Sequence, residues 1–134
     1  MSTTELELTV EVAAPPDVIF RAMSDWERQS EWIFGTTVSV VAGDGRSVGS
    51  EIDARTFGVS DRMRITRWDP PHAVEVLHLG RVVRGTGVFA VRGSRFVWSE
   101  RLDVPFFYPL VKPLFVLMLQ RSLQRFARFA EEYR

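Results

Sequence analysis

The chain has 134 residues, 46% of them hydrophobic and 12% aromatic, which suffices for one domain with a buried core but not for two. Lys plus Arg and Asp plus Glu each total 17, and the resulting net charge of zero disfavours nucleic acid as a partner. No cysteine is present, which excludes disulfides and thiolate zinc sites. The first ten residues lack the features of a signal peptide, and the longest apolar run, 114–119, is too short to span a membrane. We therefore expect one cytoplasmic domain over residues 1–134, with no membrane-spanning segment.

The start of the chain predicts one strand followed by two short helices. Residues 5–12 alternate between apolar and polar side chains, which is typical of a half-buried strand. Prolines at 15–16 end this strand, and a proline followed by Asp17 suits the first turn of a helix that runs to about Met23. A second short helix is predicted over residues 26–32.

The remainder of the chain predicts a run of strands and then a long helix. Residues 36–104 contain short β-rich segments separated by turn sequences such as GDG, DPP and RGS, which indicates six strands. After Pro105 the apolar residues take helical spacing to the end of the chain. Residues 105–109, with prolines at both ends, are expected to form a loop before the helix.

The segment from Phe106 to Met118 is apolar on nearly every side of the predicted helix, more than one sheet can cover. Four interpretations remain open for it: a cavity entrance, a dimer contact, a membrane-docking patch, or core packed against the short helices. A monomer and a homodimer are both compatible with this segment, as is transient contact with a membrane.

Turn sequences predict which side chains share one face of the sheet. A two-residue turn at 93–94, with glycine first, fixes the register of the last two strands. It places five side chains on one face, and this aromatic face is expected to point inward: Phe89, Val91, Phe96, Trp98 and Glu100. A turn at 80–81 adds Val76 and His78 to that face, and a turn at 70–71 adds Met63, Ile65 and Arg67.

Three polar residues therefore interrupt an apolar wall. Glu100 is expected opposite Gly87, which leaves room for the carboxylate, and Arg67 falls in the same row. A buried charge needs a partner, so Arg67 and Glu100 are expected to form a structural ion pair or to contact a ligand. In the predicted register His78 lies roughly 16 Å from Glu100, at ~3.3 Å per residue and ~4.8 Å per strand, too far to share a proton. The two histidines of the chain form no metal-ligand pattern, so neither a metal nor a cofactor is expected.

The order of these elements resembles the START-like superfamily, also called Bet v 1-like or SRPBCC, and within it the bacterial polyketide cyclase/dehydrase and lipid-transport group. The resemblance rests on VEVAAPPDVIF, DWERQSEW, ITRWDPPHAV and RFVWSERL in this order, followed by a long arginine-bearing helix. It implies an α+β helix-grip fold of the order β-α-α-β6-α. In that fold a curved antiparallel seven-stranded sheet wraps around the long C-terminal helix, with an apolar cavity between them. It does not imply one reaction, because members include binders, carriers and cyclases.

Our leading hypothesis is a protein that binds a hydrophobic small molecule, polyketide-like or lipid-like, between the sheet and the last helix. One alternative is a polyketide cyclase or aromatase that uses Glu100 and Arg67, and another is a lipid carrier that docks on membranes. The expected cavity residues come from the inner face of the sheet and from the first half of the helix: Met63, Ile65, Arg67, Val76, His78, Phe89, Phe96, Trp98, Glu100, Phe115 and Met118.

Overall fold

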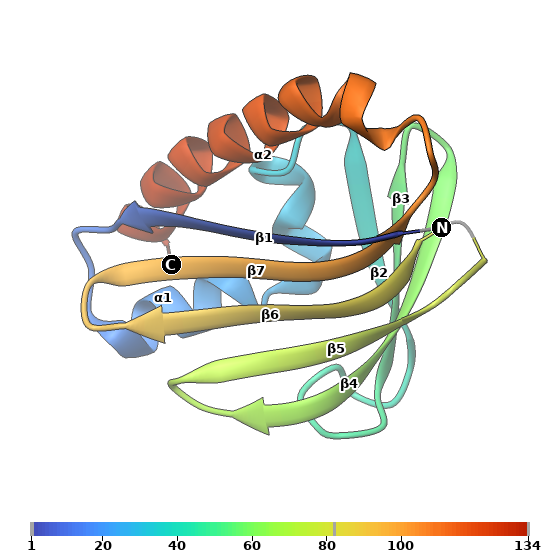
Figure 1. The fold of residues 1–134 in the computed structure, drawn as a ribbon. Coiled ribbons are helices and arrows are strands. Elements are labelled where there is room, and N and C mark those ends of the chain that lie inside the picture. Colours follow the sequence, from blue (N-terminus) through green and yellow to red (C-terminus); the bar gives the residue numbers. More distant parts are fainter. Residues whose placement is uncertain (1, 82, 134) are drawn as a thin grey trace.

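The computed structural model describes residues 2–81 and 83–133 and contains one sheet, two α-helices and one 3-10 helix (Figure 1). The elements follow in the order β1 (Ser2–Glu11), α1 (Pro16–Met23), η1 (Trp26–Glu31), β2 (Thr36–Ala42), β3 (Glu51–Thr56), β4 (Val59–Asp69), β5 (Ala73–Leu79), β6 (Arg84–Arg92), β7 (Arg95–Val104) and α2 (Tyr108–Glu131). The predicted strand, two short helices, six strands and long helix are confirmed.

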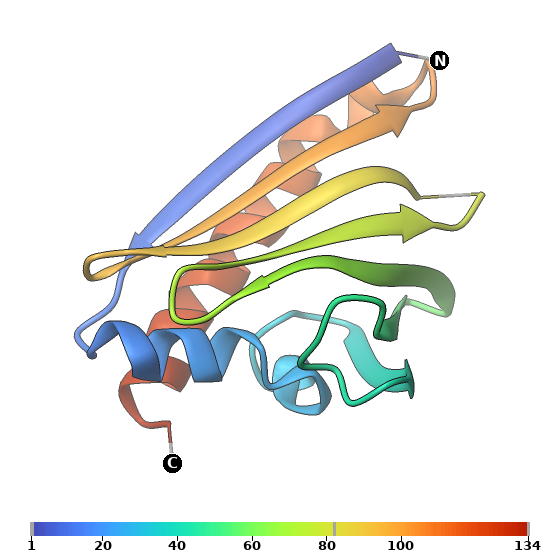
Figure 2. The ribbon, with the colours of Figure 1, turned by 90° about the horizontal axis from the view of Figure 1, so that it is seen from below.

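The sheet is antiparallel throughout and has the strand order β1-β7-β6-β5-β4-β3-β2. The first strand of the chain therefore lies beside the last one. The sheet curves, α2 crosses its concave side, and α1 and η1 lie at one end (Figures 1 and 2). This arrangement confirms the expected α+β helix-grip fold.

Local sequence explains the elements that enclose the concave side. In α1 a proline occupies the first turn, where its missing N–H is not needed, and Ile19, Phe20 and Met23 are buried on one face. The last helix begins at Tyr108, slightly earlier than the expected loop boundary. Its Pro113 lies in the first turns of the helix, so the N–H that it lacks costs only a bond to the carbonyl of residue 109. No helix in the described residues is long and apolar enough to cross a bilayer.

The solid part of the core lies under the C-terminal half of α2. Trp32, Phe96 and Phe126 are fully buried there, and the ring centroids of Phe96 and Phe126 are 4.3 Å apart. The buried residues of α2 all fall at or after Leu119. Figure 1 shows α2 diverging from the sheet toward its N-terminal end. The helix therefore closes the core with its C-terminal half.

Two of the three predicted hairpin registers needed correction. The turn at 93–94 is as predicted, with Phe89 opposite Trp98 and Gly87 opposite Glu100. The β5–β6 connection is longer than the predicted two-residue turn, so His78 pairs with Gly85 and the register moves by two residues. Because side chains alternate with a period of two, this shift keeps every residue on its predicted face and changes only its row.

Candidate functional site

A pocket of about 360 Å³ lies between the concave side of the sheet and the first half of α2. This volume is within the range of small-molecule sites, which are mostly apolar and carry a few polar groups. The apolar lining residues come from four parts of the fold: Trp26 and Ile33 from η1 and the segment after it, Ile52 and Ala54 from β3, Met63, Val74, Val76, Phe89, Trp98 and Leu102 from the other strands, and Phe115, Met118 and Leu119 from α2.

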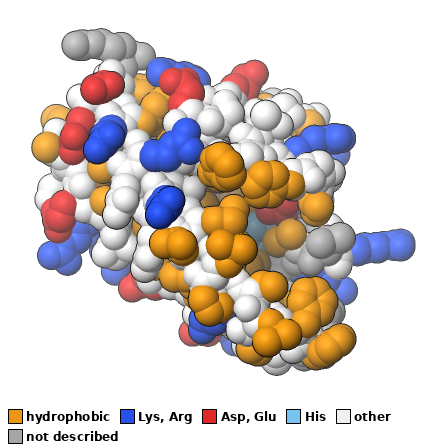
Figure 3. Space-filling view, turned by 90° about the horizontal axis from the view of Figure 1, so that it is seen from above, with side chains coloured by type: hydrophobic (Ala, Val, Ile, Leu, Met, Phe, Trp, Pro, Cys, Tyr) orange, Lys and Arg blue, Asp and Glu red, His pale blue; other side chains and the backbone are white. Residues whose placement is uncertain are grey.

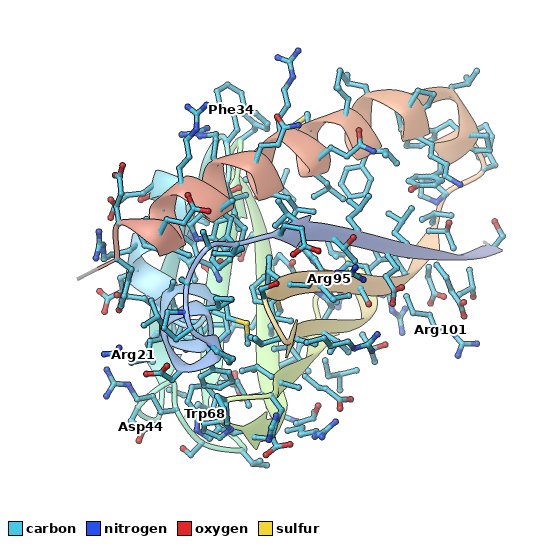
Figure 4. All side chains as sticks on the ribbon, turned by 90° about the vertical axis from the view of Figure 1, so that its left-hand side faces the viewer. Arg21, Phe34, Asp44, Trp68, Arg95 and Arg101 are labelled. Atoms are coloured by element: carbon cyan, nitrogen blue, oxygen red, sulfur yellow. The ribbon has the colours of Figure 1, made fainter. Side chains whose placement is uncertain are left out.

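Exposed apolar residues lie in the pocket lining, next to it, and on the first half of α2. Phe34 and Val59 line the pocket and are 58% and 45% exposed, and the ring of Phe57 packs edge-on against Phe34. Leu110 and Leu114, on the first half of α2, are 85% and 62% exposed. Figure 3 shows hydrophobic side chains gathered around a hollow on this face. In Figure 4 Phe34 lies close to α2, whereas Arg101 points away from the helix. We use the name apolar rim for five of these residues: Phe34, Phe57, Val59, Leu110 and Leu114.

A cluster of four polar side chains lies in the pocket wall. The side chain of His78 is only 3% exposed, with Nδ1 2.8 Å from Asp61 Oδ1 and Nε2 2.9 Å from Glu100 Oε2. The indole N–H of Trp98 donates to Glu100 Oε1 at 3.0 Å. We call these four pocket-lining residues the polar cluster: Asp61, His78, Trp98 and Glu100. Among the described lining residues, the charged or histidine side chains are Asp61, His78 and Glu100.

The cluster depends on two glycines in β6. Glu100 and His78 come from β7 and β5, and on the strand between them they pair with Gly87 and Gly85. A Cβ at Gly87 would lie 2.7 Å from Glu100 Oε2, within the space that the carboxylate occupies. Gly85 has φ +130°, and a Cβ there would lie 1.9 Å from the carbonyl oxygen of Arg101, so the backbone excludes other residues.

The contact between His78 and Glu100 overturns a prediction from the sequence. In the observed register the two residues lie two strands across and two residues along the sheet from each other. At ~4.8 Å per strand and ~3.3 Å per residue, their backbone positions are about 12 Å apart. The two side chains bridge that distance across the glycines, so His78 Nε2 and Glu100 Oε2 lie 2.9 Å apart. An error of two residues in the predicted register was therefore sufficient to hide the contact between His78 and Glu100.

Opposing effects act on the pKa of His78. Burial lowers the pKa because it disfavours the charged imidazolium, while the hydrogen bonds to Asp61 and Glu100 and their negative charges raise it. The carboxylates prevail, and the pKa rises from 6.5 to about 10. His78 is therefore protonated at neutral pH, and both of its ring N–H groups donate to carboxylates.

Arg67 does not lie in the pocket, which corrects the predicted pairing with Glu100. A β-bulge between Ile65 and Arg67 shifts the register of β4, so Arg67 pairs with Glu75 and points outward. Its guanidinium donates to Glu75 Oε2 at 2.8 Å and to Asp69 Oδ2 at 3.0 Å, with about half of the side chain exposed. The inner position next to it is taken by Trp68, whose ring packs against the helical Phe20.

The structure divides the remaining predicted cavity residues into two groups. Eight of the eleven line the pocket: Met63, Val76, His78, Phe89, Trp98, Glu100, Phe115 and Met118. Ile65 and Phe96 face inward as predicted but are fully buried in the core, away from the pocket. Among the lining residues that were not predicted is Asp61, although it precedes Met63 and Ile65 at the spacing of two that defines their face.

The polar cluster is not arranged as a metal centre. Its two carboxylates bind opposite nitrogens of one imidazole ring, so they cannot converge on an ion that this ring holds. In residues 2–81 and 83–133 no group of three or more histidine, aspartate or glutamate side chains is placed to hold a metal ion.

The curved sheet, the long helix and the pocket between them define a START-like, helix-grip protein. Residues 3–131 match the family described as polyketide cyclase / dehydrase and lipid transport, and the chain belongs to this family. Membership indicates binding of a hydrophobic ligand. The comparison with curated proteins gave no match.

Solved structures share this fold at low sequence identity. Protein NE0264 from Nitrosomonas europaea has a TM-score of 0.73 and 13% identity, with 97% of this chain and 96% of that chain covered. Protein CV1439 from Chromobacterium violaceum has a TM-score of 0.70 and 18% identity, with 95% of this chain and 97% of that chain covered. At these identities the likeness concerns the fold alone.

Proposed function

We propose that this protein binds a hydrophobic small molecule, polyketide-like or lipid-like, in the pocket between the sheet and α2. The observation that carries the proposal is a pocket of about 360 Å³ whose wall is mostly apolar and which opens beside the exposed apolar rim. Family membership supports the same class of ligand.

The balance of the lining determines how affinity would arise. At ~25 cal/mol per Å², a ligand that buries about 300 Å² of apolar surface gains about 7 kcal/mol, before the cost of association. Apolar burial therefore supplies most of the binding free energy. The polar cluster contributes orientation, because its side chains are held by one another and do not rearrange freely.

Binding is tested with N-phenyl-1-naphthylamine, a neutral apolar dye whose fluorescence rises in apolar surroundings. We expect a saturable rise with the parent protein. Ala54→Phe, which fills the pocket, should weaken dye binding at least about tenfold, the effect of losing roughly 1.4 kcal/mol. Val48→Phe adds the same ring at a residue that is 66% exposed outside the pocket, and should bind as the parent does. Thermal unfolding confirms that each variant is folded, and no saturable signal with the parent would refute the proposal.

Native mass spectrometry of protein purified from cells provides a second test. A carrier should retain a co-purifying apolar compound, whose mass then identifies the ligand. Ala54→Phe should carry less of it than the parent protein.

The position of Glu100 favours a second candidate function, a polyketide cyclase. Ring closure requires a base to remove a proton from a carbon beside a carbonyl, and a carboxylate that faces an apolar pocket suits this role. Arg67 takes no part in this candidate, because it lies on the outer face. Glu100→Gln should abolish turnover of a poly-ketone mimic and leave its affinity nearly unchanged. Equal loss of turnover and affinity would assign Glu100 to ligand anchoring instead.

A further inference from the structure

The charges in the pocket are unbalanced toward the negative. Among the described lining residues the ionisable groups are Asp61, His78 and Glu100, and none is a lysine or an arginine. An imidazolium between two carboxylates sums to a net charge of −1. These side chains are largely buried, with the imidazole 3% exposed and the carboxylates 19% and 13% exposed. A ligand would meet this charge with little water to screen it.

The hydrogen bonds of the polar cluster leave acceptors free and use up its donors. Both ring N–H groups of His78 are bonded to carboxylates, and the indole N–H of Trp98 is bonded to Glu100. A carboxylate oxygen has more than one lone pair, so Asp61 and Glu100 retain capacity to accept. The raised pKa of His78 preserves this arrangement across neutral pH. At the pocket wall, Ser122 likewise donates its hydroxyl hydrogen to the backbone carbonyl of Met118.

We propose that the pocket selects an apolar ligand whose polar group is an uncharged hydrogen-bond donor, such as a phenolic or alcoholic hydroxyl, and that it rejects carboxylates. This inference rests on the proposed function. A hydroxyl can donate to the free lone pairs of Asp61 or Glu100. A carboxylate would be buried without a cationic partner beside a net negative cluster, which is costly. A ligand of the same shape with an ether in place of the hydroxyl offers no donor and leaves the acceptor unpaired.

Three probes with one aromatic frame test this selectivity: 2-naphthol, 2-methoxynaphthalene and 2-naphthoate. Each competes at pH 7 against N-phenyl-1-naphthylamine bound to the parent protein. We expect 2-naphthol to bind at least about tenfold more tightly than either of the others, a modest value for a site that pairs a hydroxyl. Equal affinities, or a preference for 2-naphthoate, would overturn the inference and leave the proposed function standing.

Variants of the polar cluster locate the source of the preference. Glu100→Gln replaces one acceptor with an amide that donates, so the preference for 2-naphthol over 2-methoxynaphthalene should fall to about threefold or less. Glu75→Gln, the same change on the outer face of the sheet and outside the pocket, should keep the full preference. An unchanged preference in folded Glu100→Gln would overturn the assignment. Asp61→Asn gives the same test if Glu100→Gln does not fold, and the three-probe comparison needs no variant. Failure of every probe and of the dye to bind the parent would refute the proposed function itself.

Discussion

Raising the pH from 7 to 9 should lower the free energy of unfolding, because His78 then loses its proton more readily in the unfolded state than in the folded state. The pKa of His78 is about 10 in the folded protein against 6.5 for the free side chain, so the folded state binds the proton more tightly. The stabilisation is fully present below pH 6.5 and is lost as the pH rises through about 10. Each unit of pKa difference corresponds to about 1.4 kcal/mol. Between pH 7 and pH 9 the free energy of unfolding should therefore fall by about 2 to 3 kcal/mol.

This loss is large against the 5–15 kcal/mol typical of a natural domain, so urea unfolding at pH 7, 8 and 9 resolves it. Tyr108 and Tyr133 have pKa values raised above 10, mainly by burial, and titrate outside this window. His78→Gln, which keeps an amide donor but no titrating ring, should show a nearly flat profile from pH 7 to 9. The ring proton of His78, followed by NMR, should titrate near pH 10. A parent profile that is flat or rising, or the same slope in His78→Gln, would refute the reasoning.

Three further predictions concern the neighbourhood of the site. Gly87→Ala puts a Cβ 2.7 Å from Glu100 Oε2. This change should lower the free energy of unfolding by about 1–3 kcal/mol and lower the pKa of His78 measured by NMR. Gly80→Ala, whose Cβ would have its nearest described neighbour at 3.6 Å, should do neither. Arg67→Ala removes exposed ion pairs, so denaturant unfolding should change by less than about 1 kcal/mol and dye affinity should stay constant; a large loss of affinity would place this residue back in the site. The apolar rim should carry the protein with neutral phosphatidylcholine vesicles in a flotation assay, and Leu110→Ser should reduce flotation more than Val48→Ser does, whereas a parent that stays at the bottom of the gradient would exclude docking.

Short-range patterns were sufficient to predict the elements, their order and eight of the residues that line the pocket. The alternation in β1, the proline at the start of α1 and the turn at 93–94 each act through neighbouring residues, so the chain itself reveals them. The face of each strand was also robust. A register error of two residues returned Val76 and His78 to the same face, because strand geometry repeats with that period.

The face of Arg67 was predicted wrongly, as inward, because the pattern of side chains does not reveal the bulge in β4. A single extra residue in β4 reverses the face of everything beyond it, and no glycine or proline marks the bulge between Ile65 and Arg67. Outside the bulge the guanidinium finds two carboxylates at the surface, while Trp68 takes the inner position against Phe20. A charged side chain is less costly at the surface than in the core, so the bulge that exposes Arg67 and buries Trp68 is set by tertiary packing.

The sequence by itself therefore determined the elements, their order and the inward face that carries Phe89, Trp98 and Glu100. Only the tertiary structure decided that Asp61, His78 and Glu100 meet in one hydrogen-bonded group, because their contact depends on the row in which distant strands pair and on the curvature that brings those rows together. The pocket itself is likewise a tertiary property. It exists because α2 packs tightly on the sheet only from Leu119 onward, and the angle between helix and sheet is set by the whole core rather than by any local pattern.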